Sequence, residues 1–350
     1  MKLSDFDFEL PPALIAQRPV EPRDQARLLE VGETLADHTM RDLPRLLRAG
    51  DVLVYNDTRV IKARLDGRRG DARIEVTLHQ RVDETTWRAF ARPAKKLRVG
   101  DLIVFAPDFT AAVAAKGEGG EVTLALSAPG GVMPALARYG RMPLPPYIRG
   151  GRADVADEQS YQTVWGVREG AVAASTAGLH FTPALIEALD AAGIVRAPVT
   201  LHVGAGTFLP VKTEDVEKHE MHAEWGELPA ATVAAIDTAR QRGGRVVAVG
   251  TTALRVLETV TRDTGRLVPW QGETRLYILP GFRFRVVDLL LTNFHLPKST
   301  LFMLVAAFSG LARMKAAYAH AVAQGYRFFS YGDACLLHRA DRLGGHDGKS

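Results

Sequence analysis

The sequence predicts a layered α/β domain interrupted by a small inserted β-barrel domain. After about residue 170, apolar helices alternate with short apolar strands, the order expected when helices cover a sheet. From about 61 to 146 the chain instead shows short strands separated by turns, as in a small barrel or sandwich. A helical segment at 43–48 and a strand at 51–55 repeat the first pattern near the N-terminus. We therefore expect a discontinuous α/β domain at 1–62 and 150–338, a barrel at 63–149 and a loose tail at 339–350.

Alternation with a period of two identifies the strands of the insertion. Ile74, Val76 and Leu78 are apolar while their neighbours are polar, which is typical of a half-buried strand. Further strands are expected at 87–91, 101–105 and 121–126, with Pro93, Gly100 and a turn at 116–120 between them. The proline-rich stretch 142–147 is expected to lead back into the α/β domain.

Caps and glycines divide the α/β part into elements. Thr182 is the expected N-cap of a helix that begins at Pro183 and stops before Gly193. The other elements follow from apolar periodicity. Strands are expected at 195–203, 245–249, 274–279, 286–291 and 327–331, and helices at 229–240, from 252 onward, at 300–308 and at 313–323.

Composition excludes several classes of protein. Of the 350 residues, 47% are hydrophobic and 24% are charged, so the chain is expected to be globular rather than disordered. The net charge of +4 permits a polyanionic partner, and a solvated surface explains it equally well. Cys335 is the single cysteine, which excludes an intramolecular disulfide and a cysteine-rich zinc site. No apolar run approaches the ~20 residues of a membrane span. We therefore expect a cytoplasmic protein.

Polar loops follow the expected strands, where ligands bind in α/β sheets. Gly250, Thr251 and Thr252 lie at a helix start, where free N–H groups favour an anion, although a plain threonine N-cap explains them too. His202 ends a strand and precedes two glycines and a hydroxyl that could approach a ligand. These are Gly204, Gly206 and Thr207. A single histidine at such a position can also be structural.

The densest titratable cluster is His219, Glu220, His222 and Glu224. Its spacing is not that of the HExxH zinc motif. Acid–base chemistry or binding of a cationic group, a metal site and a solvated charged loop all remain open.

Three further loops carry charge or imidazole. Asp57 and Arg59 follow the strand at 51–55, and Arg59 offers a bidentate donor for phosphate or carboxylate. His295 and Lys298 follow the strand at 286–291, and Lys298 beside a helix start suits an anion such as RNA phosphate. Asp333 is expected to end the last strand, at the same edge of the sheet.

The segment 175–182 (STAGLHFT) resembles the S-adenosylmethionine:tRNA ribosyltransferase-isomerase family of queuosine biosynthesis. Further matching segments occur in order along the chain. They are 56–60 (NDTRV), 200–208 (TLHVGAGTF), 219–224 (HEMHAE), 249–258 (VGTTALRVLE), 292–301 (TNFHLPKSTL) and 326–334 (YRFFSYGDA). Ser175 departs from the family pattern, which usually has proline there, so the loop is expected to be less constrained or differently hydrogen-bonded.

The resemblance implies both an activity and a fold. Family members transfer and isomerise the ribosyl part of S-adenosylmethionine onto 7-aminomethyl-7-deazaguanine at the wobble position of tRNA. The product base is epoxyqueuosine, and adenine and methionine are released. The implied fold is an α/β domain with a small β-barrel. We expect S-adenosylmethionine as cosubstrate, tRNA as partner, no metal or permanently bound cofactor, no membrane, and a monomer.

This chemistry assigns candidate roles. A base must remove a proton from C5′ beside the sulfonium, and His180, His202 and His222 are unranked candidates. Thr176 or an imidazole could donate to the leaving adenine, and Asp333 completes the candidate catalytic set. The candidates for holding S-adenosylmethionine are Asp57, Arg59, Gly178, Gly204, Gly206, Thr207, Glu220, Glu224, Gly250, Thr251, Thr252, His295 and Lys298. Arg59 or the helix start at 250–252 would take the methionine carboxylate, and Glu220, Glu224 or the catalytic candidate Asp333 would take the ammonium.

Recognition of tRNA would use rings and cations. Phe181, Phe208 and Tyr331 are candidate stacking residues, and core packing explains them too. The basic stretches 92–98 and 138–149 could follow the anticodon stem, or could simply be solvated. Two other classes remain open, a tRNA methyltransferase and a non-catalytic RNA-binding protein. The first lacks its expected glycine-rich loop and acidic partner here, and the second leaves the clustered histidines unexplained.

Overall fold

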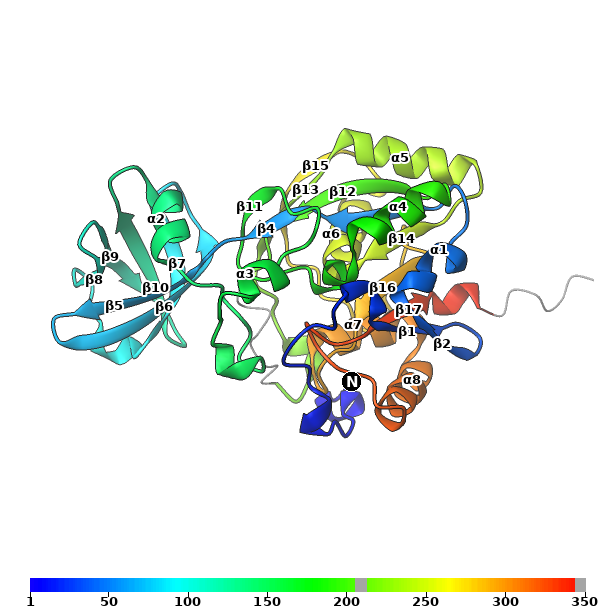
Figure 1. The fold of residues 1–350 in the computed structure, drawn as a ribbon, viewed down its shortest axis with the longest axis horizontal. Coiled ribbons are helices and arrows are strands. Elements are labelled where there is room, and N and C mark those ends of the chain that lie inside the picture. The colour runs from blue at the N-terminus through cyan, green and yellow to red at the C-terminus, as the bar shows by residue number, and fades with distance from the viewer. Residues whose placement is uncertain (205–212, 344–350) are drawn as a thin grey trace, which may run out of the picture.

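The computed structural model describes residues 1–204 and 213–343 and contains one large sheet and one closed barrel (Figure 1). In the described chain, the large sheet has nine strands in the order β15-β13-β12-β3-β14-β16-β17-β1-β2. Their bounds are β1 Arg27–Val31, β2 Leu35–Thr39, β3 Val52–Asn56, β12 Val195–Leu201, β13 Glu224–Leu228, β14 Val246–Val249, β15 Trp270–Thr274, β16 Leu289–Asn293 and β17 Ala334–His338. The predicted α/β class with an additional barrel is confirmed.

The central strands are buried on both faces, as is usual for parallel strands covered by helices. Val52 and Val54 of β3 contribute to one core and Leu53 to the other. Helices α5 (Ala230–Gln241), α6 (Gly250–Thr264), α7 (Thr300–Ser309) and α8 (Leu311–Ala323) line the first core, and α1 (Leu43–Leu46) and α4 (Pro183–Ala191) the second.

The barrel closes in the order β10-β7-β6-β5-β8-β9. The strands are β5 Arg64–Arg69, β6 Ala72–Arg81, β7 Thr86–Arg92, β8 Leu102–Ala106, β9 Phe109–Lys116 and β10 Glu121–Ser127. Ile74, Val76 and Leu78 point into its core with Trp87, as the alternation predicted. Helix α2 (Val132–Tyr139) packs on the barrel, and α3 (Asp157–Ser160) lies in the return segment. The domain boundaries at 62/63 and 149/150 stay a prediction.

Thr182 caps α4 as predicted, since its hydroxyl accepts from the N–H of Leu185 at 3.2 Å. Helix α6 begins earlier than predicted, at Gly250 with Val249 as N-cap, so Thr252 is not a cap. No single helix of the described chain is long and apolar enough to cross a membrane. Helices α7 and α8, bent by 114°, pass that test only as a pair, by length and composition.

Three predicted strands differ from the structure. The strand expected at 286–291 is β16, and it starts only at Leu289 because Glu258 accepts the N–H groups of Arg285, Val286 and Val287. The segment predicted at 274–279 lies almost wholly outside β15. Its alternating Leu276 and Ile278 are buried in the core without strand pairing.

The third difference concerns the last strand, predicted at 327–331. That segment is a loop in which Phe329 has a φ of 72°, which interrupts an extended chain. The actual last strand, β17, follows Asp333. At the start of the predicted tail, Arg339 is buried and donates to the carbonyl of Val287 at 3.2 Å, so packing continues beyond residue 338.

Candidate active site

One edge of the large sheet gathers most of the polar loops. Strands β12, β3, β14 and β16 are mutually parallel neighbours, so their carboxyl ends share this edge. Strand β17 runs antiparallel to β16, which brings its amino end, and hence Asp333, to the same edge. Asp333 therefore lies at the predicted edge although it precedes a strand instead of ending one. From strand spacing, β12 and β16 end about 14 Å apart.

A hydrogen-bonded network joins Thr176 and His180 through Asn293. These two residues begin and end the short helix η7 (Thr176–His180), and Asn293 ends β16. The Thr176 hydroxyl donates to Oδ1 of Asn293 at 3.0 Å, and Nδ2 of Asn293 lies 3.1 Å from Nε2 of His180. Nδ2 also donates to the carbonyl of Phe329 at 3.1 Å. Asn293 was not among the predicted site residues, although its place after a strand and next to Thr292 was a usable signal.

His180 is a neutral imidazole in this network. Burial, together with the charges of Arg327 and Arg23, lowers its pKa to about 3. Because the Asn293 amide nitrogen can only donate, Nε2 of His180 accepts and Nδ1 carries the hydrogen. The side chain is therefore a fixed donor at Nδ1 and a weak base.

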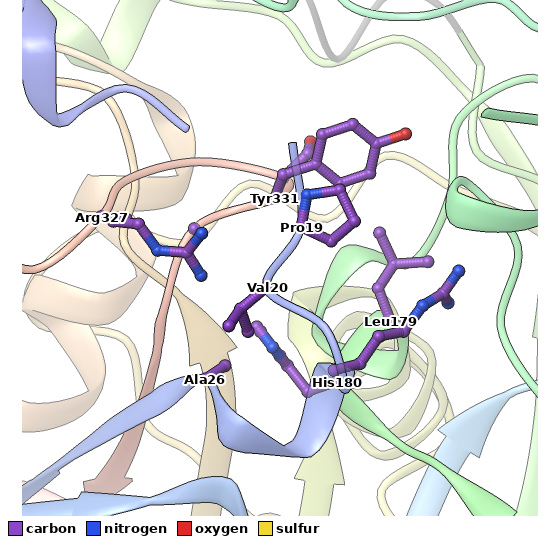
Figure 2. Close-up of a pocket in the computed structure, with 10 residues that line it drawn as sticks. Pro19, Val20, Ala26, Leu179, His180, Arg327 and Tyr331 are labelled. Carbon is purple, nitrogen blue, oxygen red and sulfur yellow. The ribbon is translucent and has the colours of Figure 1, made fainter. Parts of the chain in front are cut away.

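A small pocket opens on His180 (Figure 2). The N-terminal segment contributes Pro19 and Val20, and the loop before β17 contributes Arg327 and Tyr331. Its volume of about 10 Å³ is close to that of one water molecule. Ligand sites usually enclose about 300 Å³ or more, so this pocket has to widen before a nucleoside-sized ligand can reach His180.

The first turn of α6 lies beside the start of η7. The hydroxyls of Ser175 and Thr252 are 2.7 Å apart, and a Cβ on Gly250, whose φ is +84°, would meet the Ser175 oxygen at 3.0 Å. The N-cap Val249 forms no side-chain hydrogen bond with the first turn, and the N–H groups of a helix start favour an anion. Ser175 thus ties the loop to α6, which answers the expectation of a less constrained loop.

His202 lies just beyond the carboxyl end of β12 and stacks on Trp225, with ring centroids 5.5 Å apart. Burial lowers its pKa, and the charges of Arg168 and Arg81 lower it further. Within the described chain its Nδ1 has no hydrogen-bond partner. The ring is therefore neutral near pH 7 and keeps a nitrogen able to accept a proton.

The His219–Glu224 segment does not converge on one point. His222 and Glu220 are exposed, whereas Glu224 is buried and forms an ion pair with Arg255. Oε1 of Glu224 also accepts the N–H of Gly204 at 3.2 Å. The described residues contain no group of three or more His, Cys, Asp and Glu side chains that could hold a metal.

Asp57 and Arg59 differ in their surroundings. Asp57 is buried and accepts from the Thr200 hydroxyl at 2.8 Å, and burial raises its pKa. Arg59 is exposed on β4 (Thr58–Val60), which pairs with β11 (Arg168–Ala171). The chain after β11 is held against the loop after β12, because the N–H groups of Val172 and Ala173 both donate to the carbonyl of Val203.

Asp333 is fully engaged in local contacts. Its carboxylate accepts the backbone N–H groups of Arg27 at 3.1 Å and of Arg327 at 2.8 Å, and Nη2 of Arg327 lies 3.3 Å away. The catalytic role expected of Asp333 stays a prediction. Asp333 orients Arg327, which lines the pocket.

Two predicted ligand-binding residues, His295 and Lys298, form contacts with other parts of the chain. The side chain of His295 is buried with Nε2 3.0 Å from the Thr292 hydroxyl, and the backbone N–H of His295 donates to the hydroxyl of Tyr318 in the core. Lys298 forms an ion pair with Asp7 at 2.7 Å. Both expectations stay predictions, and a ligand at either side chain would compete with these local contacts.

The remaining predicted residues divide by location. Gly178 packs closely, since a Cβ there would meet Thr163 at 2.8 Å, and Thr251 is buried in the first turn of α6. Phe181 belongs to a core cluster, while Tyr331 lines the pocket. Gly206, Thr207 and Phe208 lie outside the described residues.

Comparison with known proteins points to one family. Residues 3–337 match the family described as queuosine biosynthesis protein. The S-adenosylmethionine:tRNA ribosyltransferase-isomerase of Rhodospirillum rubrum is 59% identical, over 97% of this chain and 99% of that protein. The protein of the same name from Methylobacterium sp. (strain 4-46) is 58% identical, over 97% and 99%. The crystal structure of S-adenosylmethionine tRNA ribosyltransferase from Thermotoga maritima is 38% identical, covers 95% of this chain and 99% of its own, and has a TM-score of 0.55.

Proposed function

The chain belongs to the family of queuosine biosynthesis proteins, and we propose that it transfers and isomerises the ribosyl moiety of S-adenosylmethionine onto tRNA. It is an enzyme. The proposed acceptor is 7-aminomethyl-7-deazaguanine at the wobble position, and the proposed products are epoxyqueuosine in tRNA, adenine and methionine. S-adenosylmethionine acts as a cosubstrate, because its ribosyl part is transferred to the tRNA while its adenine and methionine leave as separate products.

The observation that carries this proposal is the Thr176–Asn293–His180 network beside the amino end of α6. A neutral imidazole donor and an anion-binding helix end serve a substrate that has an adenine at one end and a carboxylate at the other. In the proposed reaction, Nδ1 of His180 donates to the departing adenine, while Thr176, whose one hydroxyl hydrogen is donated to Asn293, helps to orient that amide. The first turn of α6 binds the methionine carboxylate.

His202 is the proposed base. Its lowered pKa keeps it neutral, and its Nδ1 is unoccupied within the described chain. In the proposed step it takes a proton from C5′ of S-adenosylmethionine, whose acidity comes from the adjacent sulfonium. His180 is the weaker candidate, because its Nε2 already accepts from Asn293 and burial holds its pKa at about 3.

Glu224 and Asp333 are poor partners for the methionine ammonium, since each is paired with an arginine. Arg255 is an additional donor for a carboxylate. Its Nη2 is buried without a hydrogen-bond partner in the described chain, while Nη1 contacts Glu224. Together with α6, which carries it, Arg255 makes this side of the site suitable for an anionic group.

The decisive experiment incubates the enzyme with S-adenosylmethionine and tRNA that carries the aminomethyl precursor base. We expect adenine and methionine in equal amounts, together with a modified tRNA nucleoside of the expected mass. Unmodified tRNA is the control and should release neither product. Formation of S-adenosylhomocysteine would indicate methyl transfer and would overturn the proposal, as would intact S-adenosylmethionine with the precursor tRNA.

A further inference from the structure

The outer face of the barrel carries a pair of stacked rings. The rings of His79 on β6 and Phe90 on β7 have centroids 4.6 Å apart and planes inclined by 22°. The strand register shifts between Leu78 and Gln80, so His79 is the extra residue of a β-bulge. Phe90 is only partly buried. The bulge therefore places an imidazole against the ring of a neighbouring strand on the outside of the barrel.

Cations flank this pair. Arg88 and Arg92 lie two residues to either side of Phe90 on β7, so they share its face of the strand. Both are exposed, and so are Lys95 and Lys96 in the turn that follows. Within the described residues, Arg88, Arg92, Lys95 and Lys96 form no ion pair. The nearby Glu75 is paired with Arg64, and Glu121 lies 2.9 Å from Nε2 of His79.

The second basic stretch behaves differently. Arg138, Arg141 and Arg149 each contact a carboxylate, those of Asp108, Asp66 and Asp157 respectively. These arginines are therefore neutralised locally. The contrast within one chain indicates that the cations around Phe90 are available to a polyanion.

The same face adjoins the edge of the large sheet. A Cβ on Gly204, beyond β12, would lie 3.0 Å from the carbonyl oxygen of His79. After burial, the charge of Arg81 on β6 contributes to the lowered pKa of His202. Burial is also the main cause of the lowered pKa of His79, and the nearby His222 lowers it further. In the view of Figure 1, β6, β7 and β10 lie on the side of the barrel nearer the large sheet, and β8 and β9 on the far side.

We propose that this barrel platform, formed by His79, Phe90, Arg88 and Arg92, binds a single-stranded segment of RNA and leads it to the sheet edge at His202. A base stacks on Phe90, and Arg88 and Arg92 contact the phosphates on either side of it. Single strands expose the faces of their bases to such rings, whereas a duplex keeps them stacked internally. The identification of this RNA as the anticodon loop of tRNA rests on the proposed function.

The test measures binding of the full chain, without S-adenosylmethionine, to an RNA hairpin with the stem and loop of a tRNA anticodon arm. We expect Phe90→Ala to weaken binding about tenfold, the loss of one stacked base, while Phe90→Tyr keeps the affinity. Arg88→Gln with Arg92→Gln should lower the slope of log affinity against log salt by about 1.4, the loss of two single-strand phosphate contacts. The matched control, Arg138→Gln with Arg141→Gln in the same barrel, should change neither quantity.

Comparison with a blunt RNA duplex of the stem sequence completes the experiment. The variants should bind the duplex as the parent does. The platform proposal is overturned if Phe90→Ala and the Arg88/Arg92 double variant both bind the hairpin with parental affinity. It is also overturned if the variants lose equal affinity for the hairpin and for the duplex. Circular dichroism melting shows whether Phe90→Ala is folded, and the arginine pair, which is exposed, tests the proposal independently.

The outcome separates the platform from the proposed function. Hairpin binding requires no chemistry. The platform is therefore supported if the variants lose affinity for the hairpin, even if the parent enzyme releases no adenine. Conversely, if the platform variants bind the hairpin with parental affinity and the enzyme still releases adenine, the platform is refuted and the proposed function stands. With precursor tRNA, we expect the platform variants to raise KM and leave kcat unchanged.

Discussion

Asn293 Nδ2 donates to Nε2 of His180 across 3.1 Å, while its Oδ1 accepts from Thr176. One amide therefore fixes the tautomer of the imidazole and the orientation of the hydroxyl. The two partners lie on η7 and Asn293 ends β16, so the sheet itself orients the loop.

Replacement of Asn293 by Ala should lower kcat about 10²-fold, because the donor and hydroxyl then lose their fixed orientation. Stability should fall by about 1–3 kcal/mol, since buried polar groups lose their partner. Adenine release and urea unfolding measure the two effects. Thr292→Val is the matched control. Thr292 precedes Asn293 in the chain, and this variant removes the hydrogen-bond partner of His295 instead. It should cost stability and leave kcat unchanged, and equal kcat losses in both variants would contradict the assignment.

His202→Gln should lower turnover by about 10²- to 10⁴-fold, the usual contribution of a general base. His222→Gln, at an exposed residue of the neighbouring segment, should keep parental turnover. Solvent exchange of deuterium at C5′ of S-adenosylmethionine would report the base directly. Exchange that persists in His202→Gln would assign the proton transfer to another group.

Stability should decrease as pH falls from about 6.5 toward 3. Burial lowers the pKa of His180 and of His295 to about 3 in the folded chain, whereas an unfolded histidine titrates near 6.5. The unfolded chain therefore binds protons first, and stability is complete above the unfolded pKa. At pH 5 each residue should cost about 2 kcal/mol relative to pH 7. Urea unfolding at both pH values measures this. His295→Gln should remove about half of the loss, and an unchanged pH dependence would refute the buried neutral state.

Asp333→Asn should raise KM more than it lowers kcat, because Asp333 orients Arg327 at the pocket without lining it. Steady-state adenine release at varied S-adenosylmethionine gives both constants. Asp154→Asn is a control at an exposed carboxylate that pairs with Arg18. A fall in kcat with an unchanged KM would instead favour direct participation of Asp333 in the chemistry.

Ser175→Pro should fold and retain turnover within about threefold. The φ of Ser175 is −74°, within the range that proline adopts near −65°. In the described chain its N–H donates no backbone hydrogen bond, so only the contact with Thr252 is lost. We expect a stability change of at most about 1 kcal/mol, the worth of one hydrogen bond. Thermal melting and adenine release check this, and a collapse of either would show that the hydroxyl contact is essential.

Hydrophobic periodicity and caps determined the fold class, because burial patterns of period two and 3.6 are local properties of the chain. Thr182 and the barrel strand around Val76 illustrate this. The shared edge of the sheet was also predictable, since parallel strands end on one side. The strand predicted at 327–331 was wrong because its aromatic residues, Phe328, Phe329 and Tyr331, are buried from a loop.

The tertiary structure alone decided what the polar side chains contact. Asn293 and His180 are 113 residues apart, and Glu224 and Arg255 are 31 apart. The choice of a base depends on burial and on charges through space, so the sequence left His180, His202 and His222 unranked. The sequence by itself determined which loops reach the sheet edge. Only the folded chain decided that Asn293 orients the donor, that His202 keeps an unoccupied nitrogen in the described chain, and that Asp333, His295 and Lys298 are engaged elsewhere.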